Sequence, residues 1–396
     1  FMKNNSYSLS YIRVLYAMWL VRTVLSYLLT YRKSLLIADQ KEYIASITGL
    51  ILNVVSYLAI ILLVTWEQNY LLALGIGTVT EVVLNIWISW YVEQKYPFLR
   101  QRRKEKSTSS LTKRIVRDLK SLFISRISEK MLYCTDNLII SGFIGVGTVG
   151  RYANYCMITQ AISNILTILA NTIQPTVGDY FTEKNRQRNY EILRQLTFGF
   201  FCIASVVSVG LFSLITPFVR DIWLGPSYEL GWGITVFCIV VLLVRIMGLP
   251  LSLVMGVTGL FEKEKNVGAS SALLNLIVSL ALVKPYGMAG VLLGTLLSYL
   301  LQILYRYIIY FRDFLEMPGE ALRYAQDIGE YLAVIAGEVL LMQKIVPLIY
   351  GAGGMLLFCV CFLLCIAIPL LLDLVIFGRG WRLQSIVTMV KGMRKA

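Results

Sequence analysis

Two stretches, LVRTVLSYLLTYRKSLLIADQKEY at residues 20–43 and LVRIMGLPLSLVMGVTGLFEKEKN at residues 243–266, share one pattern. Each places Leu-Val-Arg inside an apolar run and ends in a charged turn. The next apolar run follows, and then GTVTEVVLN (77–85) in the first copy and GTLLSYLLQ (294–302) in the second. The shared order of helix, polar turn, helix, short loop and helix predicts a three-helix repeat whose copies have the same membrane orientation.

The chain around these copies is strongly apolar. It has 396 residues, of which 57% are hydrophobic and 15% charged, whereas about a quarter of the residues of a soluble domain are charged. A membrane-spanning helix needs about 20 mostly apolar residues. The sequence predicts an all-α polytopic membrane protein with eleven spans, at residues 11–31, 44–65, 70–92, 119–143, 148–176, 196–217, 231–258, 267–283, 287–311, 328–349 and 354–377.

The charges of the loops alternate along the chain. One set of loops holds 26 Lys and Arg and the other set holds two, Arg220 and Lys284. The positive-inside rule therefore places the basic set in the cytoplasm, which comprises residues 31–43, 93–120, 180–194, 261–266, 311–327 and 378–396. The C-terminus is then cytoplasmic and the N-terminus is outside. Because the sequence starts at Phe1 and outside the membrane, we expect helices to be missing before it.

The composition also excludes several classes of protein. The chain has no histidine, and its seven cysteines lie in apolar runs without metal-ligand spacing, so we expect no metal or other cofactor. No phosphate-binding loop is present. The basic stretch 93–120 has aromatic residues only at its start, which favours contact with lipid headgroups over binding to nucleic acid. An enzyme is disfavoured because the outer loops are too short to form a catalytic domain.

Four stretches carry a resemblance to a known family: YRKSLLIADQKEYIASI (31–47), YVEQKYPFL (91–99), TDNLIISGFIGVGTVGRYANYCMI (135–158) and IQPTVGDYF (173–181). They resemble the Wzx-type polysaccharide repeat-unit flippases of the multidrug/oligosaccharidyl-lipid/polysaccharide exporter superfamily, which includes the MATE transporters. The resemblance covers nearly the whole chain and starts at the family's fourth helix. It implies a MATE-like bundle with two lobes of six helices, related as parallel repeats, and two further C-terminal helices.

The resemblance also implies an activity and a location. The activity is export of an undecaprenyl-pyrophosphate-linked oligosaccharide across the bacterial inner membrane by alternating access. The partners would be the lipid-linked glycan, the membrane lipids and the polysaccharide polymerase machinery. The expected division is a remainder of the N-lobe (1–92), a basic linker (93–118), a C-lobe (119–317), and two accessory helices with a basic tail (318–396).

Ionisable residues inside a membrane span face a partner or a wet cavity, so they mark the candidate site. The helix at 120–143 carries a polar stripe, flanked by Asp136, that comprises Arg126, Lys130, Tyr133 and Asn137. The next helix begins with polar groups suited to sugar hydroxyls, namely Arg151, Tyr152, Asn154 and Tyr155. We expect these residues to line a cavity for an anionic glycan headgroup. The alternative is a buried network that holds the helices together, with the basic residues snorkelling to the cytoplasm.

Arg22 and Arg245, the arginines of the two Leu-Val-Arg copies, lie near the middle of their spans. They would flank the cavity and attract a diphosphate. The alternative is an ion pair within each lobe, with Glu81 as the partner of Arg22. The accessory span carries Glu330, Glu338 and Lys344, which we expect to pair or to snorkel near the span ends.

A second transport function remains open, that of a MATE-like drug or cation antiporter. Such a protein would use intramembrane acids to attract cationic drugs and to carry protons. Arginine and lysine are prominent among the intramembrane candidates here, which favours an anionic cargo.

Overall fold

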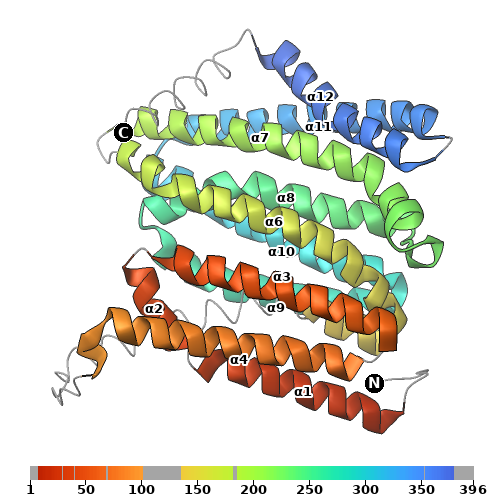
Figure 1. Cartoon of the computed structure of the whole chain (residues 1–396). Helices are drawn as coiled ribbons and strands as arrows, with labels where there is room; N and C mark the ends of the chain where they lie inside the picture. The colour runs from red at the N-terminus through yellow and green to blue at the C-terminus, as the bar shows by residue number, and fades with distance from the viewer. Residues whose placement is uncertain are drawn as a thin grey trace. The chain divides into compact units, whose positions relative to one another are not determined.

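The computed structural model describes residues 8–28, 30–39, 41–67, 70–100, 135–181, 185–351 and 353–378 (Figure 1). All long elements in these ranges are α-helices. They are α1 (Leu9–Leu28), α2 (Thr30–Ala38), α3 (Glu42–Glu67), α4 (Tyr70–Lys95), α6 (Val146–Tyr180), α7 (Arg186–Pro217), α8 (Trp232–Val257), α9 (Phe261–Tyr286), α10 (Met288–Ile308), α11 (Pro318–Tyr350) and α12 (Met355–Phe377). Residues 135–143 are also helical, and short 3₁₀ or π-helical turns occupy Pro97–Arg100, Phe218–Trp223, Pro226–Tyr228 and Ile309–Leu315.

Ten helical spans in the described residues are long and apolar enough to cross a membrane. They correspond to ten of the eleven predicted spans. Most of the remaining predicted span, 119–143, lies outside the described residues. The chain is therefore an all-helical, multi-pass membrane protein, as the sequence predicts.

The helices continue further into the charged segments than the sequence predicts. The basic segment 31–43 was expected to be a turn, yet α2 extends to Ala38. Leu36 in this helix is fully buried, and Arg32 donates a hydrogen bond to Ser89 and pairs with Glu93 of α4. Packing on α4 therefore keeps this segment helical. In the same way α9 begins at Phe261, inside another predicted turn.

The chain divides into two compact units, the N-terminal unit Met2–Thr112 and the C-terminal unit Lys113–Ala396. In the N-terminal unit, α4 packs against α1, α2 and α3. In the C-terminal unit, α10 packs against α8 and α9. In both units the third helix of the predicted repeat thus contacts the first and the second, which confirms that the two copies share one arrangement.

The crossing of α9 and α10 depends on two glycines. Gly290 and Gly294 are four residues apart, and a methyl group on either would collide with α9, at the Leu282 carbonyl and at the Ser279 hydroxyl. Small residues at this spacing let two membrane helices approach closely. Gly287, with φ 59°, forms the tight turn between the helices, a backbone conformation that glycine adopts without strain.

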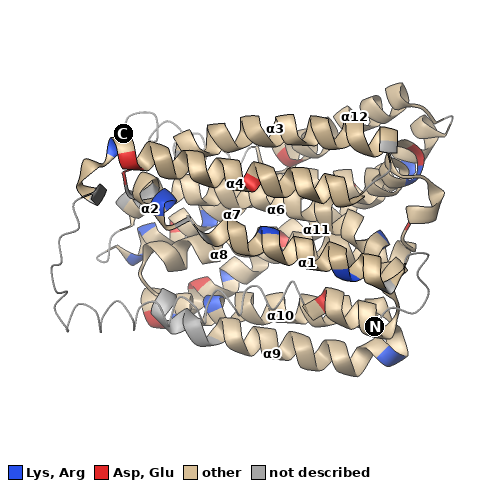
Figure 2. Cartoon of the chain, turned by 60° about the horizontal axis from the view of Figure 1, so that its bottom comes forward, with Lys and Arg blue, Asp and Glu red and all other residues tan. Residues whose placement is uncertain are grey.

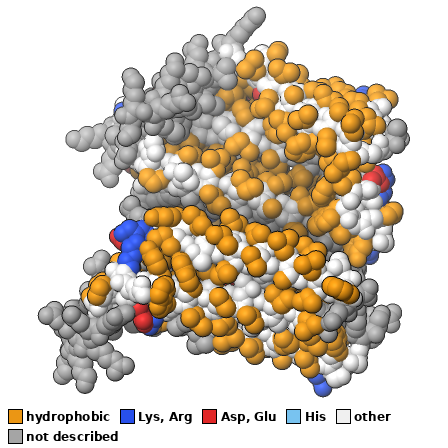
Figure 3. Space-filling view, viewed as in Figure 1, with side chains coloured by type: hydrophobic (Ala, Val, Ile, Leu, Met, Phe, Trp, Pro, Cys, Tyr) orange, Lys and Arg blue, Asp and Glu red, His pale blue; other side chains and the backbone are white. Residues whose placement is uncertain are grey.

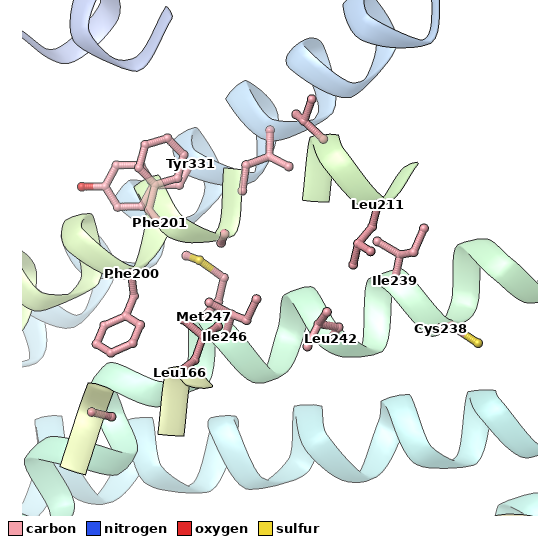
Figure 4. Packing of buried hydrophobic residues seen from close by; sticks show 14 of the residues in the cluster. Leu166, Phe200, Phe201, Leu211, Cys238, Ile239, Leu242, Ile246, Met247 and Tyr331 are labelled. Carbon is pink, nitrogen blue, oxygen red and sulfur yellow. The ribbon is translucent and has the colours of Figure 1, made fainter. Parts of the chain in front are cut away.

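The core of the C-terminal unit surrounds α7, which packs against α8, α11 and α12. Figure 4 shows the side chains of α7 and α8 that meet there, including Phe200, Leu211, Leu242 and Ile246. Phe201 stacks on Tyr331 of α11 with ring centroids 4.5 Å apart. Hydrophobic side chains also cover most of the described outer face in Figure 3, as expected of helices that contact lipid. Figure 2 shows most charged residues near the helix ends, with a few bands inside helices.

Candidate functional site

Arg22 lies in the middle of the first span and reaches α4. Its Nη2 atom is 3.8 Å from Oε1 of Glu81, so the ion pair given above as the alternative to a cavity role is present in the N-terminal unit. Gly77 lies one turn before Glu81, and a methyl group there would be 2.7 Å from Nη1 of Arg22. Glycine at this position therefore makes the room in which the guanidinium approaches the α4 backbone.

This ion pair is partly open to its surroundings. The side chains of Arg22 and Glu81 are 36% and 32% exposed. The N–O distance is near the upper limit for such a contact. The pair is thus loose, and part of each side chain is accessible to a ligand.

An apolar hollow of about 590 Å³ in the N-terminal unit ends at Arg22. Its lining comes from α1 and α4 and comprises Ile12, Leu15, Tyr16, Trp19, Arg22, Tyr70, Ala73 and Leu74. Aromatic rings with a polar tip offer flat faces and a hydrogen-bonding group together. The hollow therefore combines one cation with surfaces suited to a ring-shaped or amphipathic ligand.

Arg245 occupies the corresponding position in the C-terminal unit. Its guanidinium carbon lies 5.4 Å from the centroid of the Tyr299 ring on α10, within the range of a cation–π contact. Tyr299 follows Gly294 by five residues, and Glu81 follows Gly77 by four. Each arginine thus contacts the equivalent turn of the third helix in its own repeat, with a carboxylate in one copy and an aromatic ring in the other.

Asp136 lies in a buried polar cluster formed by three helical segments of the C-terminal unit. It is 4% exposed. Its Oδ2 accepts a hydrogen bond of 2.7 Å from the Thr295 hydroxyl, and its Oδ1 accepts one of 3.4 Å from the Asn275 amide. The Asn275 amide also donates to Thr295 over 2.9 Å. In the described part of the chain, the Asp136 carboxyl group thus accepts its hydrogen bonds from two neutral side chains.

The same cluster has a spare acceptor. Oδ1 of Asn275 is buried and has no hydrogen-bond donor. A carboxylate, an amide oxygen and a hydroxyl are ligands that hard monovalent and divalent cations prefer. A buried carboxylate is also costly unless a proton or a cation compensates its charge. The cluster can therefore hold a proton or a small cation.

A stripe of amides follows one side of α6. Asn154 is half-buried, and Asn164 and Asn171 are exposed on the surface of the C-terminal unit. The three fall within about 100° around the helix axis at 3.6 residues per turn. Lipid solvates amides poorly, so this side of α6 suits contact with water, substrate or protein.

Arg151 is exposed near the start of α6 and lines a second hollow, of about 550 Å³. The other lining residues are Ile144, Gly145, Gly147, Thr148, Ser227 and Tyr228. Asn137 is exposed as well. Both placements leave these side chains available to a ligand or a lipid headgroup.

Tyr152 and Tyr155 are buried, at 8% and 0% exposed. The Tyr155 hydroxyl accepts a hydrogen bond from the backbone of Leu230 over 3.2 Å, so these two residues contribute to packing rather than to an open surface. Arg126, Lys130 and Tyr133 lie outside the described residues. In the described part of the chain, no three His, Cys, Asp or Glu side chains gather as metal ligands do.

Sequence reasoning missed several residues of these sites: Gly77, Asn275, Thr295 and Tyr299. The Gly-Thr pair near the start of the third helix of each repeat was visible in the sequence. The contacts that this pair makes could not be predicted, because the space at Gly77 and the hydrogen bond of Thr295 to Asp136 depend on helices far apart in the chain.

Comparisons with known proteins define the fold. The chain has the fold of a solved structure entitled "Lipid II flippase MurJ, inward closed conformation", with a TM-score of 0.63 and 16% sequence identity. The similarity covers 92% of this chain and 74% of that chain. The protein is thus a multi-pass membrane protein with the fold of that structure.

The family comparison is more specific. Residues 1–181 match the model of the family described as "Polysaccharide biosynthesis protein". No curated protein matches the sequence. The family match and the fold both agree with the resemblance to polysaccharide flippases.

Proposed function

We propose that the protein is a flippase that moves a lipid-linked oligosaccharide across the bacterial cell membrane for the assembly of a surface polysaccharide. The membrane anchor of this substrate class would be undecaprenyl pyrophosphate, and transport would proceed by alternating access. The family match of residues 1–181 supports polysaccharide biosynthesis, and the fold of the chain supports transport.

The observation that carries the proposal is the repeated arginine. Arg22 and Arg245 stand in the middle of apolar helices, and each contacts the equivalent turn of its own repeat. A charge at such a depth costs about 2.5–3.5 kcal/mol on insertion scales. A diphosphate headgroup would interact favourably with both cations.

The remaining candidates fit the same cargo. The aromatic side chains beside Arg22 and the amides of α6 can contact sugar rings and hydroxyls. We assign Arg151 and Asn137 to the same surface, and Arg126, Lys130 and Tyr133 stay predicted members of it. The proposal gives the protein no catalytic residue, because flipping requires no covalent step.

We assign the coupling ion to the Asp136 cluster. A sodium ion or a proton bound by Asp136, Asn275 and Thr295 would compensate the buried carboxylate and use the spare Asn275 oxygen. This cluster is also the observation that favours the second candidate, a MATE-like drug or cation antiporter. The cationic character of the mid-span positions argues for the glycan instead.

Complementation tests the function. The full-length gene is expressed in a flippase-null strain, and surface polysaccharide and lipid-linked precursor inside the cell are both measured. The flippase proposal expects surface polysaccharide to return and the precursor pool to fall. Protein in the membrane with neither change, together with resistance to cationic drugs, would favour the antiporter.

A further inference from the structure

Two acidic side chains are buried where α7, α11 and α12 meet, within the C-terminal unit. Glu338 of α11 is 3% exposed, Asp373 of α12 is 4% exposed, and Ser205 of α7 is fully buried. The Ser205 hydroxyl donates a hydrogen bond of 2.6 Å to Oε2 of Glu338. The expectation that Glu338 would pair or snorkel near a span end is therefore wrong, because the residue lies in the interior of α11.

The hydrogen-bonding capacity of the two carboxyl groups is mostly unused. Oε1 of Glu338 and both carboxyl oxygens of Asp373 are buried without a hydrogen-bond partner. The two groups interact electrostatically, and Asp373 lies beside Ser205. Two negative charges in a dry interior would repel each other and would each lose their hydration, at a cost of several kcal/mol per ion.

No base in the described surroundings offsets these charges. The titratable group that interacts with both acids is the thiol of Cys202 on α7. The nearest ion pair on the α7–α11 interface joins Arg194 to Asp327, eleven residues before Ser205 and Glu338, or about 16 Å along the helix at 1.5 Å per residue. The face of α8 that packs on α7 is apolar, with Ile239, Leu242 and Ile246 in the core (Figure 4).

The pocket around the acids is closed along the helices. Along the helices, an aromatic cluster lies between the Arg194–Asp327 ion pair and the two acids. It comprises Phe198, Phe201, Tyr331 and Phe377. Toward the other end of the helices, Val209, Met342 and Cys365 are buried. The acids thus lie between two layers of buried side chains, and a neutral carboxyl is the form that such a site accommodates.

From this geometry we infer that Glu338 and Asp373 form a proton-binding site, in which at least one proton resides between the two carboxyl groups at neutral pH. A proton lets one carboxyl donate a hydrogen bond to the other and removes their repulsion, as in carboxyl pairs that share one proton. When the site is protonated, it stabilises the packing of α12 against α7 and α11. Its ligand is separate from the cargo and from the ion at Asp136.

Infrared difference spectroscopy of the full-length purified protein tests this site. The carbonyl stretch of protonated carboxyl groups is compared between wild type, Asp373→Asn, Glu338→Gln and the double variant at neutral pH. We expect the double variant to lack at least one protonated carboxyl per chain. Asp327→Asn is the matched control on the same interface, and because Asp327 forms an ion pair with Arg194, its spectrum should keep the wild-type band.

A protonated band that the double variant retains in full would overturn the assignment. If the double variant does not fold, Ser205→Ala is measured instead, because loss of its hydrogen bond should shift the infrared band of Glu338. An unshifted band would likewise contradict the site.

Thermal unfolding in sodium chloride and in choline chloride distinguishes a bound proton from a bound metal ion. Sodium stabilisation that the double variant loses would show that a cation occupies the site and would refute the proton.

Discussion

The guanidinium of Arg22 lies against Gly77 of α4, where an added side chain would collide with it. An added methyl group would lie 2.7 Å from Nη1. The arginine is thus held by the shape of the neighbouring helix as well as by its loose contact with Glu81.

Gly77→Ala should impair export without impairing folding. The new methyl group displaces the flexible end of Arg22, while alanine in a helix is favoured over glycine by up to about 1 kcal/mol. Export is measured by surface polysaccharide in the complemented strain, and stability by thermal unfolding. Gly75→Ala is the control, because nothing lies within 4 Å of its added methyl group. Equal export by both variants would show that the position of Arg22 does not matter.

Glu81→Gln should change the free energy of unfolding by less than about 1 kcal/mol, as expected of an exposed pair. Arg22→Gln should have a similarly small effect on unfolding and should reduce export by at least about tenfold if, as proposed, the cation contacts the cargo. Arg22→Lys is expected to restore part of the export. If Glu81→Gln and Arg22→Gln both lowered the free energy of unfolding by several kcal/mol and export fell in proportion, the role of Arg22 would be purely structural.

Asp136→Asn should abolish the dependence of transport on sodium or on a proton gradient. The neutral amide keeps the size of the side chain and removes the charge that a cation compensates. Transport is measured in proteoliposomes with each gradient imposed in turn. Ser141→Ala, a change to a hydroxyl that bonds its own helix at Leu138, is the control. Ion dependence that survives in Asp136→Asn would place the coupling ion elsewhere.

Gly290→Ala should destabilise the C-terminal unit by about 1–3 kcal/mol, the usual cost of overpacking. The added methyl group meets the backbone carbonyl of Leu282, which cannot move aside as a flexible side chain can. Thermal unfolding in detergent measures the effect. Gly337→Ala, with open space at its added methyl group, should be neutral or slightly stabilising. A Gly290→Ala variant as stable as Gly337→Ala would contradict the close crossing.

The turn between α2 and α3 makes a pH-dependent contribution to stability. Asp39 accepts hydrogen bonds of 2.6 Å from Lys41 and from the Tyr96 hydroxyl, which together lower the pKa of its carboxyl group below the ordinary value. A lowered pKa in the folded state stabilises the fold above the unfolded pKa, which is about 4. This stability is lost as the pH falls through the folded pKa.

Tyr96→Phe should therefore lower the melting temperature at neutral pH, and the difference from wild type should shrink as the pH falls below about 4. Thermal unfolding over this range provides the measurement. Tyr43→Phe is a suitable control, because its ring is exposed near the same turn. A difference that stays constant down to low pH would show that the hydrogen bond to Asp39 is not its source.

Much of the fold could be predicted because hydropathy reports directly on lipid contact. Ten spans and the three-helix repeat follow from apolar runs and from the order of polar turns. The ends of the helices could not be predicted in the same way. Charged residues mark where lipid ends, whereas the backbone of α2 stays helical beyond that point because Leu36 is buried and Arg32 pairs with Glu93.

The candidate site could be predicted only in part, for a similar reason. The Arg22–Glu81 contact joins the first and third spans of one repeat, and the repeat itself indicates it. The bonds of Asp136 to Thr295 and of Ser205 to Glu338 join residues 159 and 133 positions apart. Nothing local in the sequence links such partners, and an acid at the centre of a span gives no sign of whether its neighbours are charged, polar or protonated.

The central claim is that the full-length protein moves a lipid-linked glycan headgroup from one leaflet to the other. The most direct measurement uses proteoliposomes with purified lipid-linked oligosaccharide in the inner leaflet and follows its exposure to a glycan-cleaving enzyme added outside. We predict that exposure rises with time in wild-type vesicles and stays near the protein-free level with Arg22→Gln. Exposure that is equal in protein-free, Arg22→Gln and wild-type vesicles would contradict the account.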